Sequence, residues 1–253
     1  MRSSISLAVN SKLKKMQTEV ILVLALGIFA GFFVQTAIGF AGALIALPIL
    51  LFSIQLPDAV AYISIFYLYS SVFLIAKEWN NIDRNMLFRL ALTSIVGVVL
   101  GILVLANSKP LILKKFLGIF ILLYVAYGIL GKRKLQLKKG GVIGLGVLAG
   151  FFSGVFSTGG PLYVMCIENQ TNSIKSIRAT MIGVLGLVTL TRIPALAIGG
   201  ILTFNHLKMT LIVFPVFLLA QFLGKQAFKK TNEPLYEKSI LLLLVVSGLT
   251  LLF

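Results

Sequence analysis

The chain of 253 residues is 58% hydrophobic and only 12% charged. A soluble domain is about half apolar and about a quarter charged, so this chain has too little polar surface to coat a globule in water and must face lipid. Its formal net charge of +16 raises the question of a nucleic-acid partner, but no stretch of interleaved basic and aromatic residues is present to bind a base. The composition therefore excludes a soluble domain and argues against nucleic acid as a partner.

Eight apolar segments are separated by short polar stretches, and each is long enough to approach the roughly 20 residues with which a helix crosses a bilayer. They cover residues 19–55, 59–76, 87–106, 111–130, 141–167, 179–200, 207–224 and 238–253. The first and the fifth are broken by glycine and polar residues. We therefore predict an all-α membrane protein with about eight transmembrane helices in the lipid bilayer.

The basic residues lie almost wholly in the connections between these segments. Short basic connections stay on the cytoplasmic side during insertion, so we interpret the positive charge as a topological signal. The basic residues before the first segment and at the midpoint are Lys12, Lys14, Lys15, Lys132, Arg133, Lys134, Lys138 and Lys139. The opening residues 1–17 lack the small-residue cleavage site of a secretory signal peptide.

One pattern, Leu-Gly-x-x-Ala-Gly-Phe-Phe, occurs twice, at residues 26–33 and 145–152. Each copy is followed at once by a break rich in glycine and polar residues, and internal duplication of this kind is common in secondary transporters. We therefore predict two four-helix repeats in which the first helix is broken. The predicted units are a basic N-terminal segment (1–18), the first repeat (19–130), a basic cytoplasmic loop (131–140) and the second repeat (141–253).

The relative orientation of the two repeats stays open at this point. If all eight segments cross the membrane, the repeats are parallel; if the broken segment of each repeat does not fully cross, they are inverted. With eight crossings and a cytoplasmic N-terminus, Lys225, Lys229 and Lys230 fall outside, against the positive-inside tendency.

Glycines recur at a spacing of four residues in three of the segments. Small residues at this spacing form a smooth stripe that lets transmembrane helices approach closely. We expect the two broken helices to pack against each other through these stripes. The glycines are Gly27 and Gly31, Gly97 and Gly101, and Gly146, Gly150 and Gly154.

The breaks are the predicted binding elements. Backbone groups that lose their helical partners are tolerated in a bilayer only where they are buried in protein or line a wet cavity. The half-helix after a break begins with free N–H groups and a positive dipole end, which suits an anion, and Pro161 favours a first helical turn in the second break. The predicted substrate-binding residues are Gln35, Thr36, Gly39 and Gly42 in the first break and Ser157, Thr158, Gly159 and Gly160 in the second. The alternative is that both breaks are kinks that serve packing alone.

Arg192 is predicted as the substrate counter-charge, since it is the one basic residue deep inside an apolar segment. A charge near the centre of the bilayer costs about 3 kcal/mol on insertion scales, so it usually faces a cavity or a partner. The alternative is that the side chain snorkels to the membrane surface.

Enzymatic and metal-dependent functions find no support in the sequence. The single cysteine, Cys166, and the single histidine, His206, exclude a cysteine or histidine metal cluster. There is no phosphate-binding Gly-x-x-x-x-Gly-Lys loop, no catalytic triad and no cofactor fingerprint. The acidic residues all lie at or near segment ends, which disfavours a cation pump. We predict a protein that is not an enzyme, uses no cofactor and draws on a gradient.

The broken helices resemble those of the sulfite exporter TauE/SafE family of membrane permeases. The resemblance lies in Ala-Gly-Phe-Phe followed by a glycine-rich break and a proline, in Arg178-Ala179-Thr180, and in the stretch from Phe222-Leu223-Gly224-Lys225 through Tyr236-Glu237-Lys238. It covers nearly the whole chain. The first break, Gly39-Phe40-Ala41-Gly42, has fewer glycines than richer versions in the family.

The resemblance implies a multi-pass protein of the bacterial plasma membrane that moves a small anion such as sulfite, a sulfonate or another organic sulfur oxyanion. We expect secondary transport by alternating access around a site between the repeats. A passive anion channel would share these features, and a non-transporting scaffold would not need paired breaks. Substrate identity, direction and coupling ion stay open, and a homo-oligomer is compatible with the sequence.

Overall fold

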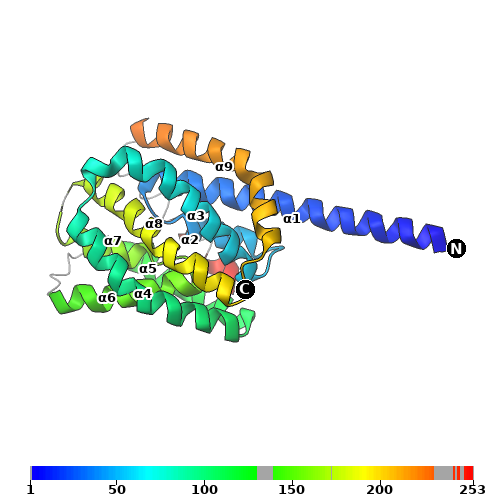
Figure 1. The fold of residues 1–253 in the computed structure, drawn as a ribbon, viewed down its shortest axis with the longest axis horizontal. Coiled ribbons are helices and arrows are strands. Elements are labelled where there is room, and N and C mark those ends of the chain that lie inside the picture. Colours follow the sequence, from blue (N-terminus) through cyan, green and yellow to red (C-terminus); the bar gives the residue numbers. More distant parts are fainter. Residues whose placement is uncertain are drawn as a thin grey trace.

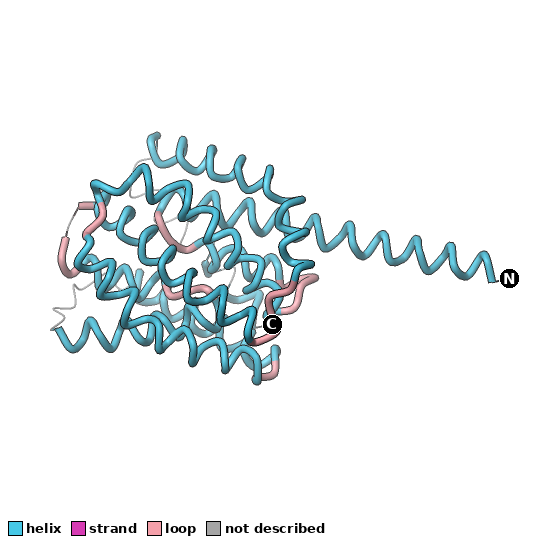
Figure 2. Tube along the Cα trace, in the orientation of Figure 1, coloured by secondary structure: helices cyan, strands magenta, loops and turns pink. Residues whose placement is uncertain are grey.

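The computed structural model describes residues 2–129, 139–171 and 173–230 and, near the C-terminus, residues 242, 244, 245 and 248–252. All regular structure in these residues is helical, as predicted. Figure 1 shows the helices side by side in one bundle, beyond which the N-terminal part of α1 (Arg2–Ile38) projects, and Figure 2 shows the short loops between them. Most of the predicted loop 131–140 lies outside the described residues.

The remaining helices follow the predicted segments. They are α2 (Gly42–Leu50), α3 (Leu56–Glu78), the 3-10 turn η1 (Trp79–Asn81), α4 (Arg84–Asn107), α5 (Pro110–Ile129), α6 (Lys139–Phe156), α7 (Gly160–Glu168), α8 (Ile174–Ile198) and α9 (Phe204–Lys230). The described residues of the last predicted segment, 238–253, are helical as well.

Within the described part, 5 helices are long and apolar enough to cross a bilayer. These candidate spans are Gln17–Ile38, Arg84–Asn107, Pro110–Gly128, Lys175–Ile198 and Phe204–Ala227. A shorter apolar helix, Gly140–Phe156, accompanies them. The predicted all-helical membrane architecture is therefore confirmed at this level.

Local sequence determines where several helices start. Asp83 Oδ1 accepts a hydrogen bond from the Met86 amide at 3.0 Å at the start of α4, and Ser173 caps α8 in the same way. Pro57 and Pro161 lie in the first turns of α3 and α7, where a missing N–H costs no helical hydrogen bond.

Both broken helices end in a residue with left-handed backbone conformation. Gly39, with φ 96°, follows the end of α1, and Ser157, with φ 60°, follows the end of α6. Ala41, with φ 69°, is also left-handed. A left-handed residue after the last turn is a common way to stop a helix and redirect the chain.

After the first break the chain turns back along α1. A Cβ atom placed on Gly31 would lie 2.8 Å from Cβ of Ala46, so α2 packs directly on α1. Beyond α2, Ser53 Oγ donates to Glu19 Oε1 at 3.2 Å. The chain therefore leaves this hairpin at the end of the bundle where it entered.

The second break has the same form. Gly159 packs on the backbone of Ala149 in α6. One turn further along α7, Tyr163 donates its hydroxyl hydrogen to Ser94 Oγ at 2.7 Å. Ser94 Oγ donates to the Leu90 carbonyl at 2.6 Å and also lies 3.2 Å from the Gly146 carbonyl oxygen of α6. Because a later residue of α7 lies beside an earlier part of α6, α7 also runs back along its partner.

The half-helices are too short to cross the membrane. α2 and α7 have 9 residues each, which corresponds to about 14 Å, against a hydrocarbon core of about 30 Å. The two broken segments are therefore hairpins that reverse direction.

The glycine stripes pack on other helices than we expected. Gly97 lies against the backbone of Val147 and Gly150 against that of Ser94, so the stripe of α6 packs along α4. Gly31 of α1 packs on α2. The expected contact between the two broken helices through their stripes is wrong, because the folded-back half-helix and α4 occupy those faces.

We predict that Gly150→Ala destabilises the protein. The added Cβ would lie 2.7 Å from Cα of Ser94, and overpacking of this kind costs about 1–3 kcal/mol. Gly144→Ala is the matched control on the same helix, since its Cβ would meet nothing within 4 Å. Thermal unfolding in detergent should show a lower melting temperature for Gly150→Ala than for the wild type. Gly144→Ala should not lower the melting temperature. Equal melting temperatures for the two variants would contradict the close packing of α4 on α6.

Candidate anion site at the two helix breaks

The two breaks meet in the interior of the bundle. A Cβ atom placed on Gly160 would lie 3.2 Å from Cβ of Phe40 and 3.7 Å from the amide nitrogen of Ala41. Residues more than a hundred positions apart in the sequence thus come into contact where both half-helices begin.

The predicted polar residues of the breaks are buried, and their side-chain oxygens form no hydrogen bond. Each is at most 2% exposed, as are Ser153 and Arg192. Buried polar groups are nearly always paired, so each exception requires an explanation. The unpartnered atoms are Gln35 Oε1, Thr36 Oγ1, Ser153 Oγ, Ser157 Oγ, Thr158 Oγ1 and Arg192 Nε.

In the first break the predicted residues face different neighbours. Gln35 Oε1 lies directly against Gly42, where a side chain would collide with it. Thr36 Cβ lies 2.9 Å from the position that a Cβ on Gly224 of α9 would take, so its hydroxyl lies near α9. Gly39 packs against Arg178.

In the second break several side-chain hydroxyls are unpartnered, while some of the backbone amides are already used. The amides of Leu162 and Tyr163 both donate to the Gly159 carbonyl at 3.2 Å, and Pro161 has no N–H. The amide donors that we expected at the start of α7 are therefore partly used within the helix. The hydroxyls of Ser153, Ser157 and Thr158 form no hydrogen bond, although Ser153 lies beside the Tyr163 hydroxyl.

Arg192 lies in the interior. It is 1% exposed, so the guanidinium does not snorkel to the surface of the bundle. Nη1 donates to the Ser153 carbonyl at 3.0 Å, Nη2 donates to Thr189 Oγ1 at 3.1 Å, and Cζ lies 5.5 Å from the centroid of the Tyr67 ring. Within the described part of the chain, these neutral groups are its contacts, and Nε has none.

Arg178 is a second buried arginine that was not predicted as a site residue, so the expectation that Arg192 is the one deeply placed basic residue is wrong. Arg178 is 5% exposed, and its Nε and Nη2 donate to the Thr36 carbonyl at 3.2 and 2.8 Å. Both arginines of α8 thus bind a carbonyl in the last turn of a broken helix, as cations near a helix C-terminus do. The available signal was its position one turn inside an apolar helix.

Two buried tyrosines were also missed. Tyr67 Oη accepts a hydrogen bond from the Ala43 amide at 3.1 Å, and Tyr163 donates to Ser94. A tyrosine within an apolar segment usually finds a partner for its hydroxyl when buried, which is the signal that the sequence offered.

The family described as Sulfite exporter TauE/SafE has a model that matches residues 23–251. The chain belongs to this family. No curated protein and no solved structure matches the chain.

The TauE/SafE protein is accordingly a multi-pass membrane transporter and not an enzyme. The resemblance inferred from the broken helices, Arg178-Ala179-Thr180 and the C-terminal segments is thereby confirmed. Among the described residues, no group of three or more His, Cys, Asp and Glu side chains is placed to hold a metal ion.

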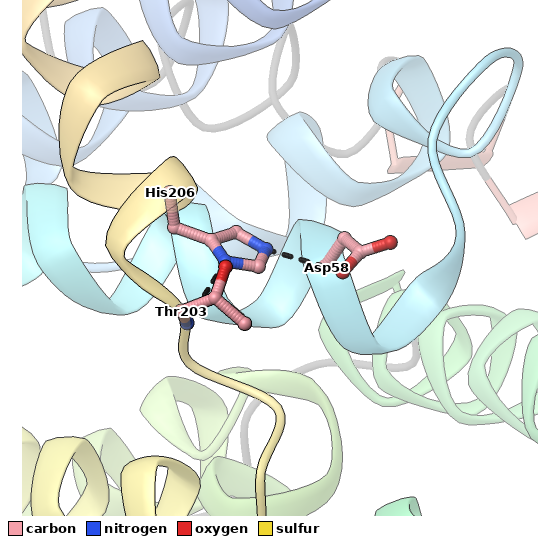
Figure 3. A network of polar contacts seen from close by, with 3 residues as sticks. All are labelled: Asp58, Thr203 and His206. Carbon is pink, nitrogen blue, oxygen red and sulfur yellow. Dashed lines mark hydrogen bonds and ion pairs between the residues drawn. The ribbon is translucent and has the colours of Figure 1, made fainter.

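His206 has a different setting, shown in Figure 3, at the start of α9. Its Nδ1 accepts a hydrogen bond from the Thr203 amide at 3.1 Å, so Nε2 carries the ring hydrogen and faces Asp58 Oδ1 at 3.1 Å. The Tyr62 ring lies 4.7 Å away between centroids. In this TauE/SafE protein the single histidine therefore ties the start of α9 to the start of α3.

Proposed function

We propose that this protein is a secondary transporter that carries a small anion across the bacterial plasma membrane, with sulfite, a sulfonate or a related organic sulfur oxyanion as its substrate. The observation that carries the proposal is the set of buried, unpartnered polar atoms at the second break and on Arg192. An oxyanion would supply the acceptors that these groups lack.

The charge of the site favours an anion. A buried cation without a compensating charge is costly, and the described contacts of Arg192 are a carbonyl, a hydroxyl and a ring. The hydroxyls of Ser153, Ser157 and Thr158 can each donate one hydrogen bond. Guanidinium N–H groups are well suited to the oxygens of an oxyanion.

The hairpins support inverted repeats over 19–130 and 141–253, with alternating access between them. The first hairpin leaves at the end where it entered, and α3, α4 and α5 follow before α6 begins. If α3, α4 and α5 each cross the membrane, these three crossings make α6 enter from the side opposite to α1. In Figure 1 the start of α6 lies at the end of the bundle opposite the N-terminus. Inverted repeats with discontinuous helices at the midplane are a known basis for alternating access.

The same arrangement gathers most of the basic connections on one side, although it places Lys12, Lys14 and Lys15 outside, against the expectation from the sequence. With re-entrant hairpins, the connections after α3, α5 and α9 lie on one side. Their basic residues then share the cytoplasmic side, and the N-terminus lies outside. The residues in question include Arg84, Lys132, Arg133, Lys134, Lys138, Lys139, Lys225, Lys229 and Lys230.

Thr158→Val is expected to lower transport without lowering stability. The substitution keeps the shape and removes a buried hydroxyl that has no partner, so the melting temperature should stay the same or rise. Loss of one hydrogen bond to a charged substrate should lower sulfite uptake into proteoliposomes by about tenfold or more.

Thr180→Val is the matched control. Thr180 Oγ1 accepts from the Asp83 amide at 2.9 Å, so its loss should cost about 1–3 kcal/mol of stability and leave the KM for sulfite unchanged. If Thr158→Val takes up sulfite as fast as the wild type, the Thr158 hydroxyl does not bind the substrate, which would count against the proposal.

Single-cysteine labelling tests the proposed topology, because the native Cys166 is buried. In intact cells an impermeant maleimide should label Gln17→Cys and Gln55→Cys, which lie at the two ends of the first hairpin. Gln226→Cys, near the end of α9, should react only after permeabilisation. Labelling of Gln17→Cys and Gln55→Cys from opposite sides would show that the first broken segment crosses the membrane.

A further inference from the structure

Tyr67 caps the start of α2 from outside the helix. Ala43 is the second residue of α2, and first-turn amides have no partner within their own helix. The N-cap residue, Ala41, makes no side-chain cap. The Tyr67 hydroxyl oxygen, 3.1 Å from the Ala43 nitrogen, supplies the acceptor.

The Tyr67 ring also contacts Arg192, the buried cation of α8. Arg192 Cζ lies 5.5 Å from the centroid of the Tyr67 ring, at a distance typical of cation–π contact. Arg192 also holds the Ser153 carbonyl of α6. Tyr67 therefore links the start of α2 to the cation that binds the other broken helix.

A further polar group beside this helix start lacks a partner. The Gln35 side chain is 1% exposed, its Oε1 lies against Gly42, and that atom makes no hydrogen bond. The two ends of a glutamine amide differ little in shape, so this side chain can present N–H groups instead. The start of α2 thus offers donors beyond the one that Tyr67 occupies.

We propose that the Tyr67 hydroxyl occupies the position that an oxygen of the transported anion takes at the start of α2, and that the anion displaces it. The proposal rests on the proposed function and deepens it, because it makes Tyr67 the positioning residue of the anion site. An anion beside Arg192 neutralises the guanidinium and so weakens its attraction to the ring face, which frees the ring to move. Binding at the second break would thereby release the capping group of the first.

Tyr67→Phe separates this role from simple packing. The variant keeps the ring and loses the oxygen, so the Ala43 amide is left without its acceptor. Without anion the protein should melt at a lower temperature than the wild type. With sulfite it should bind about threefold to tenfold more tightly, because no internal hydrogen bond has to be broken first.

Thr180→Val is the matched control. It also removes a buried hydroxyl with a hydrogen bond, but that hydroxyl accepts from the Asp83 amide, just before α4, at 2.9 Å. This variant should melt at a lower temperature too, with the sulfite affinity of the wild type.

The experiment is a thermal-unfolding titration of the purified full chain with sodium sulfite, at ionic strength held constant with sodium chloride. The expected result is a larger sulfite-induced rise in melting temperature for Tyr67→Phe than for the wild type and Thr180→Val. An equal or smaller rise for Tyr67→Phe overturns the role of Tyr67 and leaves the anion site standing. No sulfite-induced rise in any of the three proteins overturns the proposed function and this inference with it.

A spectroscopic measurement covers the case in which Tyr67→Phe does not fold. With 3-fluorotyrosine placed at position 67, the fluorine resonance should shift on addition of sulfite, whereas the same label at position 62, where the ring packs on His206, should not respond. An unchanged resonance at position 67 in protein that sulfite stabilises would overturn the displacement.

Discussion

The structure depends on one constraint, which is that backbone groups freed by a helix break inside a membrane must find partners within the protein. Each break frees carbonyls at the end of one helix and amides at the start of the next. Arg178 and Arg192 bind the carbonyls of Thr36 and Ser153, and Tyr67 binds the Ala43 amide. α3 and α8 supply all three side chains and thereby hold the two hairpins in contact.

The groups that stay unpaired give the architecture its functional meaning. Native interiors leave few polar atoms unsatisfied, yet six such atoms belong to the residues of the two breaks and Arg192. A site that must bind and release its substrate cannot satisfy its own donors fully, because the substrate would then have to displace every internal bond. In this account the arginines and Tyr67 preserve the fold, and the hydroxyls and Arg192 Nε are left for the anion.

The sequence predicted the helices well because length and apolarity decide whether a segment suits a bilayer. It predicted both breaks from glycine and hydroxyl residues, but not their reversal, because whether a chain kinks or turns back depends on backbone angles such as that of Ser157. The partners of the glycine stripes were wrong for a related reason, since a stripe indicates close approach without naming the neighbour. Arg178 was overlooked because it lies only one turn inside α8, where a basic residue is expected to face the membrane surface.

The central claim is that the second break and Arg192 form an anion site, and an experimental structure determined with selenite, a heavier analogue of sulfite, tests it most directly. Anomalous scattering would locate the selenium atom without reliance on shape. The account predicts a selenium peak beside the second break. The oxygens of the bound selenite should lie within hydrogen-bond distance of the Ser157 and Thr158 hydroxyls and of Arg192 Nε. A selenium peak elsewhere in the bundle, with water alone at these groups, would contradict it.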